Sequence, residues 1–489
     1  MLPFTSLLGL ESSTQTRSSR DALYLKVREL IVQGKLPSGT KLPSTRRLAT
    51  ELGMSRSTVV DVFDQLKMEG YLEASQGAAT RVSSVASEHF KHARHASLDE
   101  PPHPSTEHLN LDRWHNSDPP TAISLTAFRP GLPDISLFPK EEWNACLTRA
   151  IKRRVNYDLS YCGYTGHTPL KAQIIEHVSH ARYVTAEPEQ VIIVPSSQAA
   201  FDVIAKLALV HGDCVWAEDP GYPGFINLVQ AYDGAIERAP VDQFGANFDN
   251  LPGQPKLIYV SPSHQYPTGA MLSLERRLNL LELSREHGAL IVEDDYDSDF
   301  QFDGAPIASL QGLDKGRNVI YVGTFSKTLA PGLRTAYLIA PKHLTQAAES
   351  IAALSGHSVP VHVQVALADF LELGLFRKHI KKMTAEYSQR MDLLYSLLQP
   401  ALKEVFHLIP PKGGLQYALI SKSPIDDKAL SRYLFGHGFH TAPISDLTKQ
   451  SSTTGLLLGI GLVTGQEINR MAPQMCMAIL GWLETVRKP

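Results

Sequence analysis

The stretch that decides the fold of most of this chain is VIYVGTFSKTLAPGLRTAY, residues 319–337. Its opening run, VIYVG, predicts a buried strand, and a turn follows it. Lys327 lies in that turn, seven residues before Arg334. A lysine there can form a Schiff base with an aldehyde, while Thr324, Ser326 and Arg334 hold a phosphate. The alternative is a surface lysine in a loop, but the pattern S-K-x-x-x-P-G-x-R after a strand favours the chemical role.

A second apolar strand ends in acids, in ALIVEDDYDSDF, residues 289–300. Because the carboxyl ends of parallel strands face the ligand crevice, we expect Asp294 to lie there. A carboxylate at that point keeps the nitrogen of a pyridine cofactor protonated, so that the ring withdraws electrons. Tyr296 is placed to hydrogen-bond the phenolic oxygen of the same ring. Acid-rich strand ends also occur in metal sites, but no histidine converges here and we predict no metal.

Two further stretches offer contacts for the phosphate and the ring. VIIVPSSQAAFDVIAKLAL, residues 191–209, has the pattern of a strand, a turn and a helix. Ser197 and the amides of Ser197 and Gln198 would then face a phosphate at the helix N-terminus. In EDPGYPGF, residues 218–225, Tyr222 is placed to stack on the pyridine ring. A tyrosine in such a place is, taken singly, more often a packing residue.

The N-terminal part predicts a fold that reads DNA. ALYLKVRELIVQGKL, residues 22–36, has the apolar spacing of an amphipathic helix. Ser44 is placed to cap a short second helix, Gly53 makes a turn, and Ser55 caps a third helix over residues 56–69. Two helices joined by a short glycine turn form a helix-turn-helix, whose second helix can enter the major groove.

Side chains around this motif are of the types that contact DNA. YLEA and ATRVSS flank a glycine and predict a two-stranded wing. The start of the recognition helix would face bases and phosphates, while basic side chains and the wing backbone neutralise phosphates. The alternative for any one of these residues is ordinary solvated surface. The predicted DNA contacts are Lys41, Ser44, Arg46, Ser55, Arg56, Thr58 and Gly77.

Length and composition predict a soluble protein of more than one domain. The chain has 489 residues, of which 43% are hydrophobic and 20% are charged. Residues 85–122 are rich in Pro, His, Ser and Asp, so we interpret them as a linker between domains at 17–84 and 123–489. The N-terminus lacks the pattern of a signal peptide, and no run approaches the ~18 apolar residues of a membrane span. We therefore expect a cytoplasmic protein.

These motifs carry a resemblance to a known family. LPSTRRLA, LGMSRSTV and QLKMEGYL resemble the winged helix-turn-helix of the GntR superfamily. Residues 123–489, including FRPGLPDISLFP at 128–139, resemble the fold-type I aminotransferases, which are α/β proteins with a mainly parallel central sheet. The combination is similar to the MocR subfamily of GntR regulators, which implies double-stranded DNA as a partner and pyridoxal 5′-phosphate (PLP) as the cofactor.

The resemblance also implies roles for single residues. Lys327 would be the Schiff-base lysine, and SHQYPTG, residues 263–269, would place His264 in the cofactor site. The pattern Y-x4-G at Tyr161 matches the tyrosine that aminotransferases send to the phosphate of a neighbouring subunit, which implies a homodimer. The remaining cofactor contacts would be Asp294 at the pyridinium, Tyr296 at the phenolic oxygen, Tyr222 over the ring, and Ser197, Gln198, Thr324, Ser326 and Arg334 around the phosphate.

Two departures bear on whether the protein turns over a substrate. Tyr266 stands where aminotransferases usually have an asparagine, and Leu457 in GLLLGIGL falls where an arginine would clamp the substrate carboxylate. These departures favour a transcriptional regulator that senses PLP, or an amine such as γ-aminobutyrate or taurine, through an aldimine at Lys327. The alternative is an active aminotransferase with a fused DNA-binding domain. The sequence does not select the effector.

Overall fold

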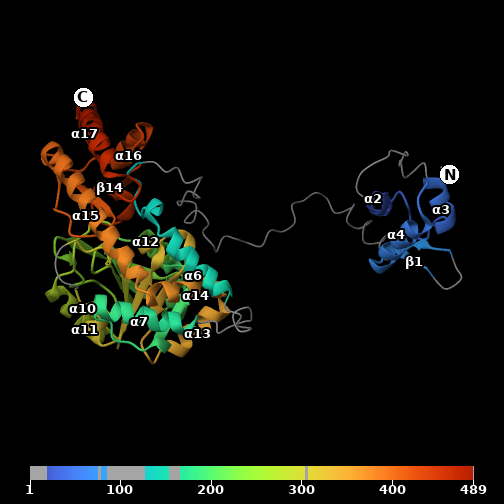
Figure 1. Ribbon diagram of the computed structural model, residues 1–489, viewed down its shortest axis with the longest axis horizontal. Helices are drawn as coiled ribbons and strands as arrows, with labels where there is room; N and C mark the ends of the chain where they lie inside the picture. Colours follow the sequence, from blue (N-terminus) through green and yellow to red (C-terminus); the bar gives the residue numbers. More distant parts are fainter. Residues whose placement is uncertain (1–18, 75–78, 85–126, 153–165, 303–306, 488–489) are drawn as a thin grey trace. The chain divides into compact units, whose positions relative to one another are not determined.

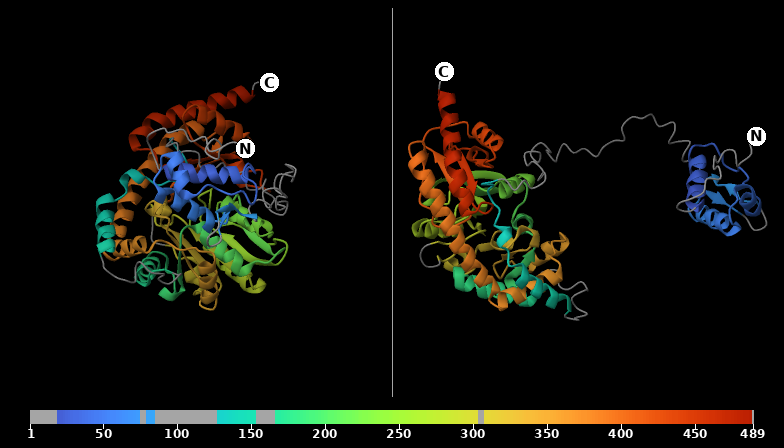
Figure 2. Two further views of the ribbon diagram at one scale, coloured as in Figure 1. Left: turned by 90° about the vertical axis from the view of Figure 1, so that its right-hand side faces the viewer. Right: turned by 45° about the horizontal axis from the view of Figure 1, so that its top comes forward.

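The chain consists of two compact units, residues 1–108 (unit 1) and residues 109–489 (unit 2) (Figures 1 and 2). The structure is a computed structural model, and it describes residues 19–74, 79–84, 127–152, 166–302 and 307–487. Each unit has its own hydrophobic core, so each is considered by itself.

Unit 1 is a winged helix. Helices α2 (Ser19–Val32), α3 (Thr45–Leu52) and α4 (Arg56–Met68) precede strands β1 (Leu72–Glu73) and β2 (Arg81–Val82), which pair antiparallel. The apolar faces of the helices and the first wing strand enclose one core, and this confirms the predicted helix-turn-helix and wing. The buried core residues include Leu23, Val27, Leu30, Leu48, Val59, Val62, Phe63, Leu66 and Leu72.

The helix boundaries of unit 1 follow from side-chain caps. The hydroxyl oxygen of Ser44 accepts a hydrogen bond from the amide of Arg47 at 3.3 Å, and that of Ser55 accepts one from the amide of Thr58 at 3.1 Å. Gly53 ends α3 with a φ of 64°, a left-handed conformation that glycine adopts without strain. Both predicted caps and the predicted glycine turn are confirmed.

Unit 2 is built on an eight-stranded sheet in the order β3-β10-β9-β8-β7-β4-β5-β6. Strands β4, β5, β7, β8 and β9 are parallel to one another, while β10 and β6 run antiparallel to their neighbours. The mainly parallel sheet is as predicted. The strands are β3 (Val191–Val194), β4 (Cys214–Asp219), β5 (Ala235–Asp242), β6 (Gly245–Ala246), β7 (Pro255–Val260), β8 (Leu290–Asp295), β9 (Val319–Thr324) and β10 (Ala336–Ile339).

Helices cover both faces of this sheet, which explains why strands such as β3 and β9 are almost continuously apolar. Alternate residues of one strand enter different cores: Ile192 packs with α8, α9 and α13, whereas Ile193 packs with α6, α7 and α14. Helices α10 and α11 cover the other end of the second face. The helices are α6 (Lys140–Lys152), α7 (Thr168–Arg182), α8 (Ser197–Ala208), α9 (Pro223–Ala231), α10 (Leu274–His287), α11 (Leu310–Asp314), α13 (Thr345–Leu354) and α14 (Val361–Glu372).

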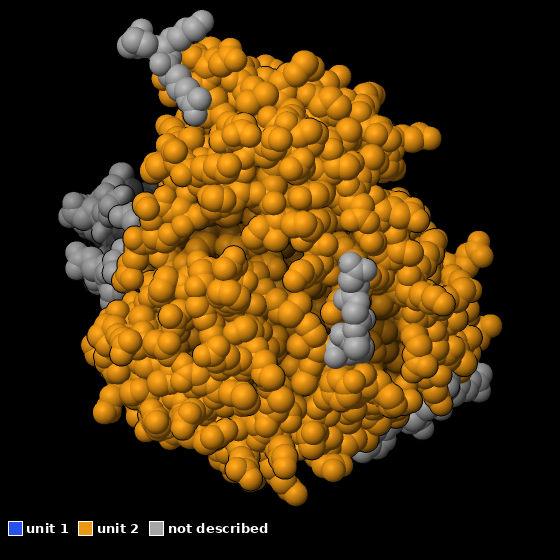
Figure 3. All heavy atoms as spheres, turned by 90° about the vertical axis from the view of Figure 1, so that its left-hand side faces the viewer, with its two compact units in different colours: residues 1–108 blue, residues 109–489 orange. Residues whose placement is uncertain are grey.

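The C-terminal part of unit 2 forms a second core around a four-stranded antiparallel sheet, here called the small sheet. The long helix α15 (Leu375–Leu402) leads from the large sheet into this part and packs along α17 (Gly465–Arg487), as Figure 1 shows. The described atoms of unit 2 form one continuous body (Figure 3). The small sheet comprises β11 (Phe406–His407), β12 (Gln416–Ser421), β13 (Ala442–Pro443) and β14 (Gly455–Gly459), with α16 (Asp427–Gly436) beside it.

Candidate cofactor site and DNA-binding surface

The parallel strands of unit 2 end at one edge of the sheet, and polar side chains follow each of these ends. Because β8 and β9 are parallel with Asp294 opposite Val322, Asp294 lies close to the short helix α12 (Phe325–Thr328) that follows β9. The other strand ends lead to residues of the same predicted site: Ser197 after β3, Tyr222 after β4 and His264 after β7.

Lys327 lies in α12, half-buried, and its Nζ donates a hydrogen bond to the carbonyl oxygen of Gly131 at 2.5 Å. Burial lowers the pKa of Lys327, and the carboxylates of Asp297 and Asp294 act in the opposite direction. A lysine whose pKa is lowered offers more of its neutral, nucleophilic form near neutral pH than an exposed lysine does. Lys327 therefore meets the chemical requirement for a Schiff-base lysine.

Asp294 is a buried carboxyl group, 6% exposed, and its Oδ2 accepts a hydrogen bond from the hydroxyl of Tyr259 at 2.6 Å. Burial raises the pKa of Asp294 to about 7, although the Tyr259 hydrogen bond and the charge of Lys327 both favour its ionised form. A cation placed against this carboxylate would lower that pKa again. The residue thus fits a protonated ring nitrogen, the group that PLP would present here.

Three tyrosines follow one another in edge-to-face contact. The ring centroids of Tyr222 and Tyr266 are 5.7 Å apart, and those of Tyr266 and Tyr296 are 6.3 Å apart. The hydroxyl of Tyr296 donates to the backbone carbonyl of His264 at 2.9 Å. A Cβ at Gly224 would lie 2.5 Å from the Tyr222 ring, so any residue other than glycine would displace this ring. The row of rings supplies an aromatic face, as a stacked cofactor requires.

The phosphate side of the predicted site is the start of α8. Its N-cap is Ser196, whose hydroxyl oxygen accepts from the amide of Ala199 at 3.1 Å. Ser197 and Gln198 are the first two residues of the helix, where backbone amides have no partner within the helix. The prediction passed over Ser196, although a serine before an apolar helical run is the usual signal of a cap.

Three other predicted phosphate contacts, Thr324, Ser326 and Arg334, lie at the end of β9 and after it. Thr324 caps α12, because its hydroxyl oxygen accepts from the amide of Ser326 at 3.1 Å. The side chain of Arg334 is exposed, and its backbone is left-handed with a φ of 47°. The predicted set around Lys327 thus comes from the starts of α8 and α12 and from the turn before β10.

Hydrogen bonds from its own residues hold the turn that carries His264 and Tyr266. Gln265 donates through Nε2 to the carbonyl oxygen of Pro220 at 2.8 Å, and its Oε1 accepts from the hydroxyl of Thr268 at 2.7 Å. The buried Glu218 accepts from the hydroxyl of Ser261 at 2.6 Å, and burial raises the pKa of Glu218 to about 8. These bonds attach the turn after β7 to the end of β4.

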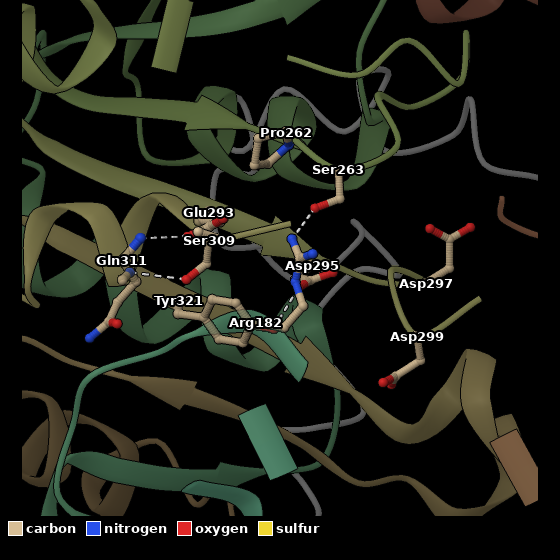
Figure 4. A network of polar contacts seen from close by, with 12 residues as sticks. Arg182, Pro262, Ser263, Glu293, Asp295, Asp297, Asp299, Ser309, Gln311 and Tyr321 are labelled. Atoms are coloured by element: carbon tan, nitrogen blue, oxygen red, sulfur yellow. Dashed lines mark hydrogen bonds and ion pairs between the residues drawn. The ribbon is translucent and has the colours of Figure 1, made fainter. Parts of the chain in front are cut away.

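A buried ion pair, which the sequence did not predict, holds the end of β8 (Figure 4). Arg182, the last residue of α7, donates through Nε to Asp295 Oδ2 at 2.9 Å and through a terminal nitrogen to the hydroxyl of Ser263. The hydroxyl of Tyr321 donates to the same Asp295 oxygen at 2.5 Å. Asp294 and His264 are each adjacent in sequence to a member of this network, so Arg182 helps to set their positions.

The small sheet is joined to the large one close to the site. Both carboxylate oxygens of Asp219 accept backbone amides, from Lys449 at 3.0 Å, Gln450 at 3.0 Å and Ser451 at 2.9 Å. We call this contact the Asp219 joint. It connects the end of β4, three residues before Tyr222, with the loop that precedes β14.

Comparisons with known proteins agree with both units. Residues 19–82 match the family described as bacterial regulatory proteins, gntR family, and residues 145–454 match aminotransferase class I and II. The chain is 36% identical to the probable rhizopine catabolism regulatory protein MocR of Rhizobium meliloti, over 86% of each chain. It is 33% identical to the HTH-type transcriptional regulator TauR of Rhodobacter capsulatus, over 78% of this chain and 80% of TauR. The chain belongs to the MocR-type GntR regulators.

Solved structures support the fold of unit 2. The α-aminoadipate aminotransferase LysN of Thermus thermophilus superposes with a TM-score of 0.69 at 24% identity, over 80% of this chain and all of LysN. The predicted architecture of a MocR-type regulator, a GntR winged helix followed by a fold-type I aminotransferase domain, is confirmed. In the described part of the chain no helix is long and apolar enough to cross a membrane, and no acidic, histidine or cysteine cluster could hold a metal ion.

GntR-type helix-turn-helix domains bind DNA operators, and unit 1 presents the residues predicted to do so. Lys41, Ser44, Arg46, Ser55 and Arg56 are exposed, and Thr58 is half-buried at the start of α4. Gly77 in the wing and Tyr161, predicted to reach a partner subunit, lie outside the described residues. The roles of these residues therefore stay predictions.

Proposed function

We propose that this MocR-type regulator is a DNA-binding homodimer of the cytoplasm that senses PLP, or a primary amine that reacts with PLP, at Lys327. PLP supplies an aldehyde that reacts with primary amines and a ring that withdraws electrons. Lys327 would hold the aldehyde carbon, Asp294 the ring nitrogen, and the α8 amides with Arg334 the phosphate. The observation that carries the proposal is the placement of Lys327 and the buried carboxyl of Asp294 at the ends of two adjacent parallel strands, at the same edge of the sheet.

The amine exchange needs no oxidant. When bound, PLP would supply an aldehyde carbon that a primary amine could take over from the Nζ of Lys327. The Nζ of Lys327 would take up the proton that the incoming ammonium gives up, so atoms and charge balance. We infer that unit 2 can adopt two arrangements, and an effector that binds one of them more tightly would shift the protein toward it.

The small sheet favours sensing over turnover. Leu457 lies in β14, fully buried, between Ala418 of β12 and Ala442 of β13. An aliphatic side chain cannot make the bidentate pair with a carboxylate that an arginine makes. An amino acid bound at this site would lack that anchor, and its turnover should be slow.

The test is to add PLP and then candidate amines while the cofactor absorbance and operator binding are followed. We expect some amine to shift the absorbance and change the DNA affinity, with no product formed when a keto acid is present. The Lys327→Ala variant should lose the absorbance response. Sustained turnover of an amino acid with a keto acid would instead support the second candidate, an active aminotransferase, which the presence of Lys327 and Asp294 at one sheet edge favours.

A further inference from the structure

Residues 127–137, here called the bridging segment, are attached at their start to the small sheet. The carbonyl oxygen of Ala127 accepts a hydrogen bond from the amide of His440 at 2.9 Å, and that of Phe128 accepts one from the amide of Gly459 at 2.8 Å. The side chain of Phe128 is fully buried in the core that surrounds the small sheet. Backbone and side chain together therefore fix this end of the bridging segment.

The long helix α15 holds the bridging segment farther along. The carboxylate of Asp134 pairs with the guanidinium of Arg390 at 2.8 Å, and the amide of Asp134 donates to the hydroxyl of Tyr387 at 2.8 Å. Arg390 and Tyr387 are buried, at 3% and 1% exposure. The bridging segment is thus fixed at two points to the C-terminal part of unit 2.

Between these two points the bridging segment meets Lys327 at the edge of the large sheet. The Nζ of Lys327 donates to the carbonyl oxygen of Gly131 at 2.5 Å, and a Cβ at Gly131 would lie 3.5 Å from the same nitrogen. Among the described residues, no other hydrogen bond joins the bridging segment to α12. Its attachment to α12 therefore depends on the state of one nitrogen atom.

The backbone of the bridging segment is left-handed at Phe128, with a φ of 65°, and at Gly131, with a φ of 79°. Glycine adopts this conformation without strain, but it is unfavourable for a phenylalanine. A strained conformation persists only while the surrounding contacts impose it. We therefore expect the middle of the bridging segment to change its conformation when one of these contacts is lost.

The hydrogen bond to Gly131 needs a proton on the Nζ of Lys327. The ammonium group of a free lysine offers three protons in directions that can rotate. The same nitrogen keeps at most one proton once a double bond joins it to an aldehyde carbon. The contact with Gly131 is therefore strong for a free lysine, and weak or absent for a lysine bonded to a cofactor.

We propose that the carbonyl of Gly131 is the docking point of the free Lys327 amine, and that this hydrogen bond sets the conformation of the bridging segment according to whether Lys327 is bonded to the cofactor or released by an effector. This inference rests on the proposed function and adds to it the regulation of the site. In the sequence, the bridging segment follows the predicted linker, residues 85–122. An effector that releases Lys327 thus acts on the described part of unit 2 that is nearest along the chain to the DNA-binding unit.

The first test uses the full chain without cofactor. Amide hydrogen exchange is followed by mass spectrometry in peptides that cover the bridging segment and residues 455–461. Lys327→Met removes the donor and should speed exchange in both peptides by about tenfold, the effect expected for one hydrogen bond from a charged group. Lys327→Arg can still donate to a carbonyl and should stay within about threefold of the wild type.

The matched control is Lys206→Met, which removes another bonded lysine, one that donates to Asp202 at 2.8 Å. It should leave exchange in the bridging segment unchanged. If Lys327→Met also leaves that exchange unchanged, the proposal is wrong. An equal increase in α10, residues 274–287, would overturn it as well, because Lys327 would then stabilise unit 2 as a whole and not this segment.

The second test adds PLP and then propylamine to the full chain. In the wild type, exchange in the bridging segment should rise by about tenfold with PLP and fall again with propylamine, which frees Lys327. In Lys327→Met neither addition should change it. If propylamine shifts the cofactor absorbance while exchange in the segment stays constant, the bridging segment does not report the state of Lys327 and the proposal fails. If no amine shifts the absorbance, the proposed function fails, whereas the first test still decides whether Gly131 holds Lys327.

Discussion

Replacing Asp294 with asparagine should stabilise the cofactor-free protein at pH 8. The folded pKa of this carboxyl is raised to about 7, against an unfolded value near 3.9. A raised folded pKa means that the native state binds more protons, so the stability from this group is present below pH 4 and is lost as pH rises through 7. A difference of about three pKa units, at 1.36 kcal/mol each, means that this group reduces the free energy of unfolding by at most about 4 kcal/mol between low and high pH.

The asparagine variant removes this pH dependence without removing the hydrogen bond, because its amide oxygen can still accept from Tyr259. Urea unfolding at pH 5 and pH 8, followed by tryptophan fluorescence, measures the difference. The tryptophans among the described residues, Trp143, Trp216 and Trp482, all lie in unit 2, so a change in their fluorescence reports that unit. The variant should gain stability over the wild type at pH 8, and much less at pH 5.

The neighbouring residue provides the matched control. Burial by itself would raise the pKa of Asp295, but Arg182 holds it below its ordinary value. Asp295→Asn should therefore destabilise unit 2 at pH 8, by about 3–5 kcal/mol, because the buried guanidinium of Arg182 loses its partner. If Asp294→Asn destabilises the cofactor-free protein as much as Asp295→Asn does, Asp294 is an ordinary ionised carboxylate and the reasoning is refuted.

Three further outcomes are expected. Arg56→Ala should weaken operator binding by about 1–3 kcal/mol if Arg56 contacts a base. If Arg56 contacts a phosphate, the variant should release about one counterion fewer on binding DNA. Binding titrations at two salt concentrations distinguish these cases. Ser55→Ala should cost unit 1 about 1 kcal/mol, visible in the unfolding of isolated residues 1–108, with the exposed Ser38, outside the helices, changed to alanine as its control. Gly413→Ala should destabilise unit 2 by about 1–3 kcal/mol or more, because the new methyl group overlaps His264, whereas Gly436→Ala meets no neighbour and should not.

Local features of the fold could be predicted from the sequence because their causes lie within a few residues. The caps at Ser44 and Ser55 each bond an amide three residues ahead, and the apolar strands are buried on both faces as their composition requires. Lys327 and Asp294 could be predicted for the same reason, because each lies at the carboxyl end of a strand in a parallel sheet.

The contacts that set the chemistry of the site are not local, and no spacing reveals them. Arg182 is 113 residues from Asp295, and Lys327 is 196 residues from Gly131, whose carbonyl holds its Nζ. Within residues 294–299 the sequence pattern singles out Asp294 and Tyr296, and nothing in the order of the carboxylates indicates that Asp297 pairs with His264. Which aspartate faces which partner depends on how α7 and the turn after β7 pack against this segment.

The Asp219 joint has a consequence for how regulators of this type can diverge. Its carboxylate is held by three main-chain amides, and a main-chain amide is the same in every residue except proline. The side chains at 449 and 450 can therefore change, proline excepted, while the joint stays closed, whereas the hydroxyl of Ser451 also accepts from the amide of Thr453 at 3.1 Å. A protein built in this way can change the surface of this loop during evolution without loosening the attachment of the small sheet to the large one.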